Sequence, residues 1–130
     1  MNDYSSLITV ISLIYYIVLT FKVGQARGKY GVKAPATTGH EMFERALRVQ
    51  MNMLEQMVFF LPSLWLFTIY LDFPKIAAGL GAVWLVGRIL YNRSYLQGSN
   101  RGLGFGLSLL AASLLLIGGA AGVIMHLIAD

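Results

Sequence analysis

One segment of the sequence carries arginine, amide and glutamate side chains at spacings that share a helix face. Successive residues of an α-helix are rotated by about 100° around its axis. Four polar side chains therefore fall within an arc of about 80° and form one stripe: Arg45, Arg48, Asn52 and Glu55. Gln50 points well away from this stripe. Guanidinium groups bind carboxylates through paired hydrogen bonds, so this stripe has the chemistry to bind an anionic ligand.

A second polar stripe follows in an otherwise apolar segment. Arg88, Tyr91 and Tyr95 are spaced by three and four residues, which places them on one face of a helix. A charged group at the centre of a membrane helix costs about 2.5–3.5 kcal/mol on insertion scales. We therefore expect the two stripes to meet at one end of a helix bundle.

Mutual pairing is the alternative explanation for these charges. Glu44 could pair with Arg48 at i,i+4, and Glu55 with Arg88 across helices. Interior ion pairs do hold membrane bundles together. The arginine, tyrosine and amide groups, however, outnumber what two glutamates can satisfy, and this surplus favours an anionic ligand with several carboxylates.

The composition indicates an integral membrane protein. The chain has 130 residues, of which 57% are hydrophobic and 12% charged, and its mean hydropathy is +0.66. A soluble domain of this length needs more charge to stay dissolved. Because cysteine is absent, any thiol must come with the substrate. The net charge of +4 does not indicate nucleic-acid binding, because the few basic residues lie beside apolar spans.

Four apolar stretches predict an all-α fold, a membrane-spanning four-helix bundle that forms a single domain over residues 1–130. Tyr4 to Phe21 and Gly102 to Ala129 contain no charge. The start of the chain, with Asp3 and no basic flank, does not fit a signal peptide. The predicted helices cover residues 4–26, 39–71, 74–96 and 102–128.

Turn residues and charges predict the breaks between these helices. The basic segment Gly24 to Gly39 predicts a loop, and Thr38 with Glu41 resembles a capping box that starts the second helix. Asn92 to Arg101 predicts a second polar loop. The third apolar stretch is too short to span alone, so its helix must continue through Arg88, which cannot face lipid cheaply.

The charge distribution predicts the orientation. Nine of the ten basic residues fall beside the two long loops, and only Lys75 lies at the other end, with Asp3, Asp72 and Asp130. By the positive-inside rule, both long loops are cytoplasmic and both termini lie outside. In a bacterium this membrane would be the inner membrane.

The glycines and histidines have structural explanations. Gly118 and Gly122 form a GxxxG spacing that marks a helix interface. The glycines of Gly102 to Gly106 allow close packing, since no strand precedes them as dinucleotide binding requires. His40 and His126 belong to opposite ends of the topology, so they cannot share a metal and are expected to cap helices or lie at the membrane interface.

One string resembles the signature of the family of membrane-associated proteins in eicosanoid and glutathione metabolism. It reads Phe43-Glu-Arg-Ala-Leu-Arg-Val-Gln-Met-Asn-Met-Leu-Glu55 and fills the family pattern F-E-R, R-x-Q-x-N and a following E. Three further segments also match the family: Thr37-Thr38-Gly39, the Arg88/Tyr91/Tyr95 trio and Asn100-Arg101-Gly-Leu103. The resemblance covers nearly the whole chain.

The resemblance implies a homotrimer of four-helix subunits that binds glutathione between neighbours near the cytoplasmic face. Within one subunit the implied glutathione-binding residues are Arg48, Asn52, Glu55, Arg88, Tyr91 and Tyr95. The adjacent subunit is implied to contribute Arg27 and Gln50. Arg101 is implied to be the catalytic residue that stabilises the glutathione thiolate, with no metal required, and Arg45 a structural partner of Glu44 or Glu41.

Two departures from the leukotriene-forming branch bear on the substrate. Gly28 stands where that branch has a second arginine, and Gln56 where it has a tyrosine. The resemblance therefore implies a detoxifying transferase that conjugates glutathione to lipophilic electrophiles, or a glutathione-dependent peroxidase acting on lipid hydroperoxides. Both kinds of partner would arrive from the bilayer.

Two rival functions stay open at this stage. A small four-helix drug–proton antiporter also carries a membrane carboxylate, here Glu55, although that function does not explain the surplus of arginines. A non-catalytic, lipid-binding member of the same family is the other rival. The presence of Arg101 favours catalysis over lipid binding alone.

Overall fold

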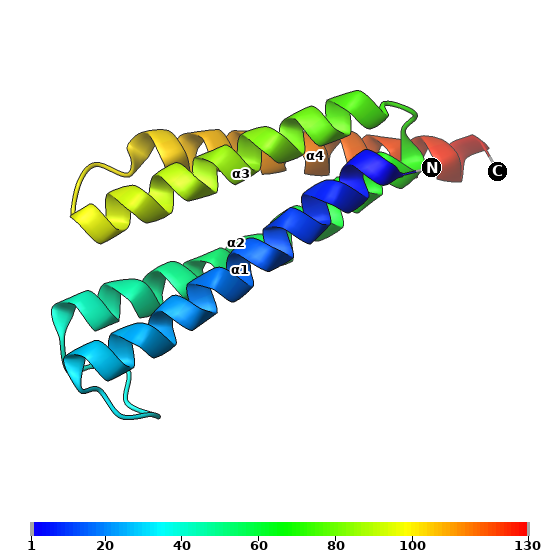
Figure 1. Ribbon diagram of the computed structural model, residues 1–130. Coiled ribbons are helices and arrows are strands. Elements are labelled where there is room, and N and C mark those ends of the chain that lie inside the picture. The colour runs from blue at the N-terminus through cyan, green and yellow to red at the C-terminus, as the bar shows by residue number, and fades with distance from the viewer. Residues whose placement is uncertain (1, 130) are drawn as a thin grey trace.

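The computed structural model describes residues 2–129, and it consists of four α-helices joined by short connections (Figure 1). The helices are α1 (Asp3–Tyr30), α2 (Glu41–Tyr70), α3 (Pro74–Gln97) and α4 (Gly102–Ala129). The described residues contain no strand, so the predicted all-α fold is confirmed. Asp130, one of the acidic residues expected at the same end as Lys75, lies outside the described residues.

Helix α1 is longer than the sequence predicts. It continues through Gly24 and Gly28 to Tyr30, and the next residue, Gly31, has a φ of 70°, the left-handed conformation that favours glycine at a helix C-terminus. The predicted loop over Gly24 to Gly39 is therefore wrong in its first half. Buried contacts of Val23 in α1 with the cluster around Val32 and Phe43 hold the additional turns against α2.

The start of α2 also differs from the prediction. Its N-cap is His40, whose Nδ1 accepts a hydrogen bond from the backbone N–H of Met42 at 3.1 Å. The capping-box prediction for Thr38 is wrong, whereas the capping role expected of His40 is confirmed. Glu44 completes the cap, since its Oε2 accepts from the N–H of Gly39 at 3.2 Å.

The connection between α3 and α4 is short. Helix α3 continues to Gln97 and ends at Gly98, which has a φ of 71°, so most of the loop predicted from Asn92 is helical. The expectation that α3 runs through Arg88 and hides it from lipid is confirmed, because the Arg88 side chain is only 1% exposed.

The four helices run antiparallel, with both chain ends at one end of the bundle and the α1–α2 and α3–α4 connections at the other (Figure 1). We call these the terminal end and the loop end. Helix α3 packs along α4, α2 contacts all three other helices, and α1 contacts α2 and α3. Toward the loop end, the pair formed by α1 and α2 diverges from the pair formed by α3 and α4 (Figure 1).

Glycines set the closest helix contacts. At the terminal end, a Cβ on Gly118 would lie 2.5 Å from the Cε2 of Phe67 in α2, and one on Gly122 would lie 2.9 Å from the Cβ of Tyr70. The helix interface predicted from the GxxxG spacing is thus confirmed. Nearer the loop end, a Cβ on Gly87 would lie 2.8 Å from the backbone nitrogen of Ser108, so α3 and α4 touch through their backbones.

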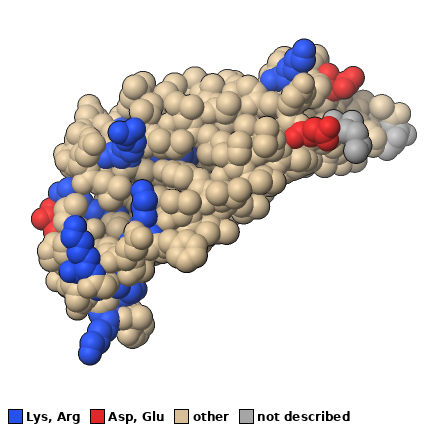
Figure 2. Space-filling view, in the orientation of Figure 1, with Lys and Arg blue, Asp and Glu red and all other residues tan. Residues whose placement is uncertain are grey.

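The helix surfaces identify a membrane protein. Among the described residues, α1, α2 and α4 are long and apolar enough to cross a bilayer. Helix α3 is less apolar, because Lys75, Arg88 and Arg93 lie within it. Lysine and arginine side chains gather at the loop end, whereas most of the visible surface carries no charge (Figure 2).

Candidate functional site

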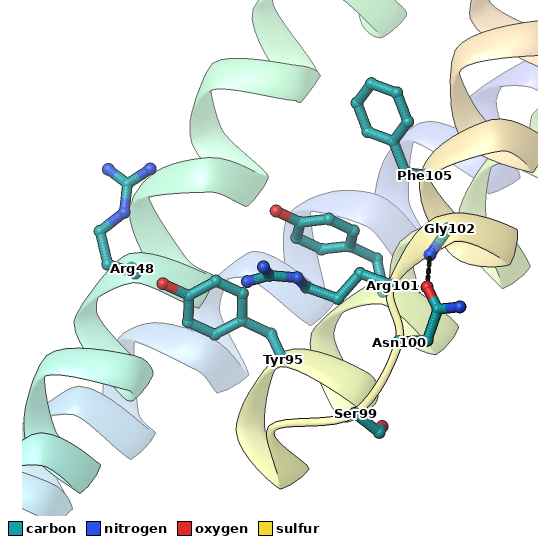
Figure 3. Close-up of a pocket in the computed structure, with 8 residues that line it drawn as sticks. Arg48, Tyr95, Ser99, Asn100, Arg101, Gly102 and Phe105 are labelled. Atoms are coloured by element: carbon teal, nitrogen blue, oxygen red, sulfur yellow. Dashed lines mark hydrogen bonds between the residues drawn. The ribbon is translucent and has the colours of Figure 1, made fainter.

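A cavity of about 560 Å³ opens at the loop end between α2 and the α3–α4 pair (Figure 3). Four of the predicted site residues line it, with Arg48 from α2, Tyr91 and Tyr95 from α3, and Arg101 from the short connection. The remaining lining residues are Ser99, Asn100, Gly102 and Phe105. The structure therefore brings one residue of the first polar stripe together with two residues of the second.

Arg101 is held against an aromatic ring. Its guanidinium carbon lies 4.6 Å from the ring centroid of Tyr95, and the rings of Tyr91 and Tyr95 are 6.2 Å apart and tilted. The Oδ1 of Asn100 accepts a hydrogen bond from the N–H of Gly102 at 2.8 Å, which fixes the start of α4 beside Arg101 (Figure 3). A permanent positive charge is thus displayed at the cavity wall.

Arg88 lies beneath the cavity and does not line it. Its Nη1 donates to the Oδ1 of Asn52 at 2.6 Å, and its Nε and Nη2 donate to the Oγ of Ser108 at 3.1 and 2.9 Å. The guanidinium carbon is 4.4 Å from the ring centroid of Tyr91. The pairing of Arg88 with Glu55 is not found, because Asn52, one turn closer to the loop end, takes its place.

The two glutamates of the pairing alternative have other environments. The Glu44 carboxylate accepts from the backbone at the start of α2, so it does not pair with Arg48. Glu55 is exposed on α2, and none of the hydrogen bonds of residues 2–129 involves it. Mutual pairing therefore does not account for the arginines at the loop end.

Arg45 is a structural residue, as the resemblance implies. Its Nη2 pairs with the Oε1 of Glu41 at 2.7 Å, which is the only ion pair within the described range. Its Nη1 donates to the carbonyl of Leu96 at 3.1 Å, which ties the end of α3 to α2. Arg45 also lines a smaller cavity of about 250 Å³, whose walls include Tyr95 and Arg101 of the larger one.

Besides Arg88, four predicted residues do not line the cavity of this subunit: Arg27, Gln50, Asn52 and Glu55. Arg27 donates to the carbonyl of Ala36 at 2.8 Å and stacks on the ring of Phe43 at 4.7 Å, so it closes the loop after α1. Gln50 donates to the hydroxyl of Thr20 at 3.1 Å, on the α1 side of α2. Neither side chain joins Arg48 within one chain.

Ser108 and Phe105 are residues that sequence reasoning missed. Ser108 is one of two serines in an apolar helix, and no periodic pattern distinguishes it from the other serines of the membrane helices. Phe105 follows Arg101 by one helical turn, and this spacing is the signal that could have placed both on the same wall. Phe105 supplies an apolar rim to an otherwise polar cavity.

The arrangement suits an anionic ligand. Arg48 and Arg101 present guanidinium groups from different elements, and the two tyrosines add hydroxyl groups between them. Guanidinium groups favour carboxylates and thiolates, because they stay charged at every accessible pH.

Comparisons with known proteins agree with this chemistry. The profile of the MAPEG family matches residues 5–121. The chain is 54% identical over 123 residues to an uncharacterized protein of Synechocystis, covering 94% of this chain and 89% of that protein. It is 36% identical over 117 residues to human microsomal glutathione S-transferase 2, covering 89% and 79%.

A further relative is bovine leukotriene C4 synthase, 33% identical over 97 residues, which are 74% of this chain and 63% of that protein. The names of the last two relatives both denote enzymes of glutathione or leukotriene chemistry. Taken with the four-helix membrane fold and the arginine-lined cavity, these matches show that the chain belongs to the MAPEG family.

Proposed function

We propose that the protein is a membrane-bound glutathione transferase that conjugates the glutathione thiolate to lipophilic electrophiles. The observation that supports it most directly is the cavity where Arg48 and Arg101 meet two tyrosines at the loop end of a MAPEG bundle. Glutathione has two carboxylates, one amine and one thiol, which suits a site rich in guanidinium groups.

Different side chains would bind different groups of glutathione. Arg48, with Tyr91 and Tyr95, would hold the carboxylates and peptide groups of glutathione. Asn52 adds amide N–H donors, since only its Oδ1 is used by Arg88. Glu55, exposed on α2, is the acid that would bind the ligand's amine.

A homotrimer would complete this site. Arg27 and Gln50 lie away from the cavity of their own chain, so they would reach glutathione only in a neighbouring subunit. Chemical cross-linking in mild detergent should trap trimers, whereas products limited to monomers and dimers would contradict this assembly.

Arg101 would supply the catalytic effect. An unperturbed thiol has a pKa of about 8.5, so at pH 7 only a few per cent is thiolate. A guanidinium beside the sulfur lowers the thiol pKa and exchanges no proton itself. The thiolate sulfur then forms a bond to the electrophilic carbon, and the leaving group departs with the electron pair of the bond that breaks.

The apolar partner would approach from the bilayer. Phe105 forms the membrane-side rim of the cavity, and the helices around it expose apolar side chains. The same thiolate can reduce a lipid hydroperoxide, in which case two glutathione molecules give the disulfide while the hydroperoxide gives an alcohol and water. Gly28 and Gln56, which replace the residues of the leukotriene-forming branch, favour general electrophiles over leukotriene synthesis.

The deciding experiment uses purified protein in detergent or lipid nanodiscs. It is assayed with glutathione plus a model electrophile and, separately, plus a lipid hydroperoxide. We expect conjugation that depends on protein concentration and is strongly reduced in an Arg48→Ala variant. Glutathione binding without turnover of either substrate would instead support a non-catalytic lipid-binding protein, and proton-coupled drug transport in vesicles would support an antiporter.

The orientation is part of the proposal, because glutathione is a cytoplasmic thiol. Most of the basic residues lie in the two connections of the loop end or in the helix turns toward it, and this favours a cytoplasmic loop end. Single cysteines introduced at Lys33, Gln97 and Asp72 can be labelled with an impermeant reagent. Labelling from outside is expected only at Asp72, and labelling at Lys33 would overturn the assigned face.

A further inference from the structure

A buried arginine without an acidic partner lies directly under the candidate site. Arg88 is 1% exposed, yet no carboxylate among residues 2–129 forms an ion pair with it. Its hydrogen bonds go instead to two neutral groups on different helices, Asn52 on α2 and Ser108 on α4. A buried cation needs such partners, because leaving its donors unpaired is costly.

Ser108 is used to its full hydrogen-bonding capacity. Its Oγ accepts from both Nε and Nη2 of Arg88, and it donates to the carbonyl of Gly104 at 2.9 Å. A hydroxyl has one donor and two acceptor positions, so no capacity remains. The close backbone contact between Gly87 and Ser108 leaves the hydroxyl little freedom to move.

The anchored guanidinium touches two residues of the proposed glutathione site. It stacks under the ring of Tyr91 at 4.4 Å, and it holds the Oδ1 of Asn52 at 2.6 Å. The bond to Asn52 orients that amide, so that its N–H groups remain the donors for a ligand. The position of Ser108 therefore determines where a tyrosine and an amide are presented.

We propose that Ser108 is a positioning residue for glutathione binding, acting through Arg88 on Tyr91 and Asn52. This inference rests on the proposed function, and it assigns a role to a side chain that does not line the cavity. Arg101 lies on a separate segment and is stacked on Tyr95, so thiolate formation does not depend on Ser108. The predicted effect is therefore on binding of glutathione and not on the acidity of its thiol.

Ser108→Ala tests the proposal, and Ser63→Ala is its matched control. Ser63 is also buried, and its Oγ also donates to a carbonyl four residues earlier, that of Phe59 at 2.7 Å, but it meets no arginine. We expect Ser108→Ala to raise the KM for glutathione about tenfold, as loss of hydrogen bonds to a charged group implies. The kcat at saturation and the pKa of the bound thiol should stay at the parent values, and Ser63→Ala should match the parent throughout.

A double variant separates positioning from stability. Ser108→Ala leaves two donors of Arg88 unpaired, whereas Ser108→Ala combined with Arg88→Met removes those donors as well. We expect the double variant to recover melting temperature while its KM stays high. A KM that returns to the parent value in the double variant, or a KM of Ser108→Ala equal to that of Ser63→Ala, would overturn the proposal.

A readout without glutathione keeps this test distinct from that of the proposed function. In protein labelled with 3-fluorotyrosine, the fluorine resonance of Tyr91 is identified by its loss in Tyr91→Phe. It should shift in Ser108→Ala and not in Ser63→Ala. If the parent neither binds nor turns over glutathione, the proposed function fails, and an unshifted Tyr91 resonance contradicts the coupling from Ser108 to Tyr91.

Discussion

The two ends of the bundle differ in how closely α2 approaches the other helices. At the terminal end, α4 approaches α2 through glycines, and the backbone around Gly119 lies against Leu66 and Phe67. At the loop end, α2 and the α3–α4 pair are separated by a cavity lined with arginine and tyrosine side chains. Between α2 and α4, close backbone packing is replaced by long polar side chains toward the loop end, whereas α3 and α4 keep backbone contacts at Gly87 and Gly104.

The difference shows how a small membrane protein keeps charged groups near a bilayer. Lipid offers no hydrophobic drive for helix association, so tight packing of small residues must hold the helices together. Glycines provide this packing between α2 and α4 at the terminal end and between α3 and α4 nearer the loop end, while arginines at the loop end interact with rings, an amide and a backbone carbonyl. Along α2, the contacts that hold the helices together and the side chains that line the cavity therefore lie at different ends of the helix.

The largest effect is expected from adding a side chain at Gly119, where α4 lies against the backbone of α2. Gly119→Val places side-chain atoms against the backbone of α2, and overpacking of this kind costs about 1–3 kcal/mol or more. Gly106→Val is the control on the same helix, since a Cβ there has no neighbour within 4 Å. Melting temperature and size-exclusion profiles in detergent should deteriorate only in Gly119→Val, and equal losses in both variants would contradict the packing argument.

Removing the charge at the cavity should have the next largest effect. In Arg101→Ala, the pKa of the bound thiol rises toward its ordinary value, and each unit costs about tenfold in thiolate at neutral pH. Turnover should fall by at least that factor near pH 7 and recover at high pH, with a smaller change in glutathione affinity. The thiolate absorbance of bound glutathione, titrated with pH, measures this shift, and an unchanged titration with unchanged turnover rules out the catalytic role.

The ring beneath Arg101 should matter less than the arginine itself. A stacked guanidinium gains about 0.5–2 kcal/mol from an aromatic face, so Tyr95→Leu should reduce turnover at neutral pH about threefold or more. Tyr95→Phe keeps the ring and should retain the acidity of the bound thiol. If the Phe and Leu variants raise the thiol pKa equally, the hydroxyl and not the ring positions Arg101.

The smallest effect is expected at the exposed ion pair. Glu41 and Arg45 have side chains that are 73% and 29% exposed, and such pairs contribute about 0–1 kcal/mol. Glu41→Gln should leave melting temperature and the KM for glutathione near the parent values, because Arg45 keeps its bond to Leu96. A loss of stability comparable to that of Gly119→Val would contradict the small contribution expected of this exposed ion pair.

Much of the fold can be predicted from the sequence, because apolar stretches and charges define the helices. The end of α1 could not, since Gly24 and Gly28 resemble loop residues locally. Buried contacts around Val23 and Phe43 outweighed that local preference and extended the helix. The cap of α2 was ambiguous for a similar reason, because Thr38 and His40 both carry acceptors and only tertiary geometry selects one.

The candidate site was predictable where residues share a helix face and not where contacts cross between helices. Helical spacing places Tyr91 and Tyr95 on one face, and the structure puts both at the cavity. Asn52 and Glu55 lie about one turn apart on α2. Which of them meets Arg88 depends on the offset between α2 and α3 along the helix axis. No periodicity in either helix encodes that offset, and Ser108 was missed for the same reason.

The extension of α1 to Tyr30 bears on where the cavity lies relative to the bilayer. Helices of 28 and 30 residues measure about 42–45 Å at 1.5 Å per residue, while the hydrocarbon core of a bilayer is about 30 Å thick. The helices that span the core therefore also reach into the headgroup layer, and the cavity at their loop end lies where water and acyl chains meet. A water-soluble thiol and an oil-soluble partner can both reach such a cavity without leaving the phase in which each dissolves.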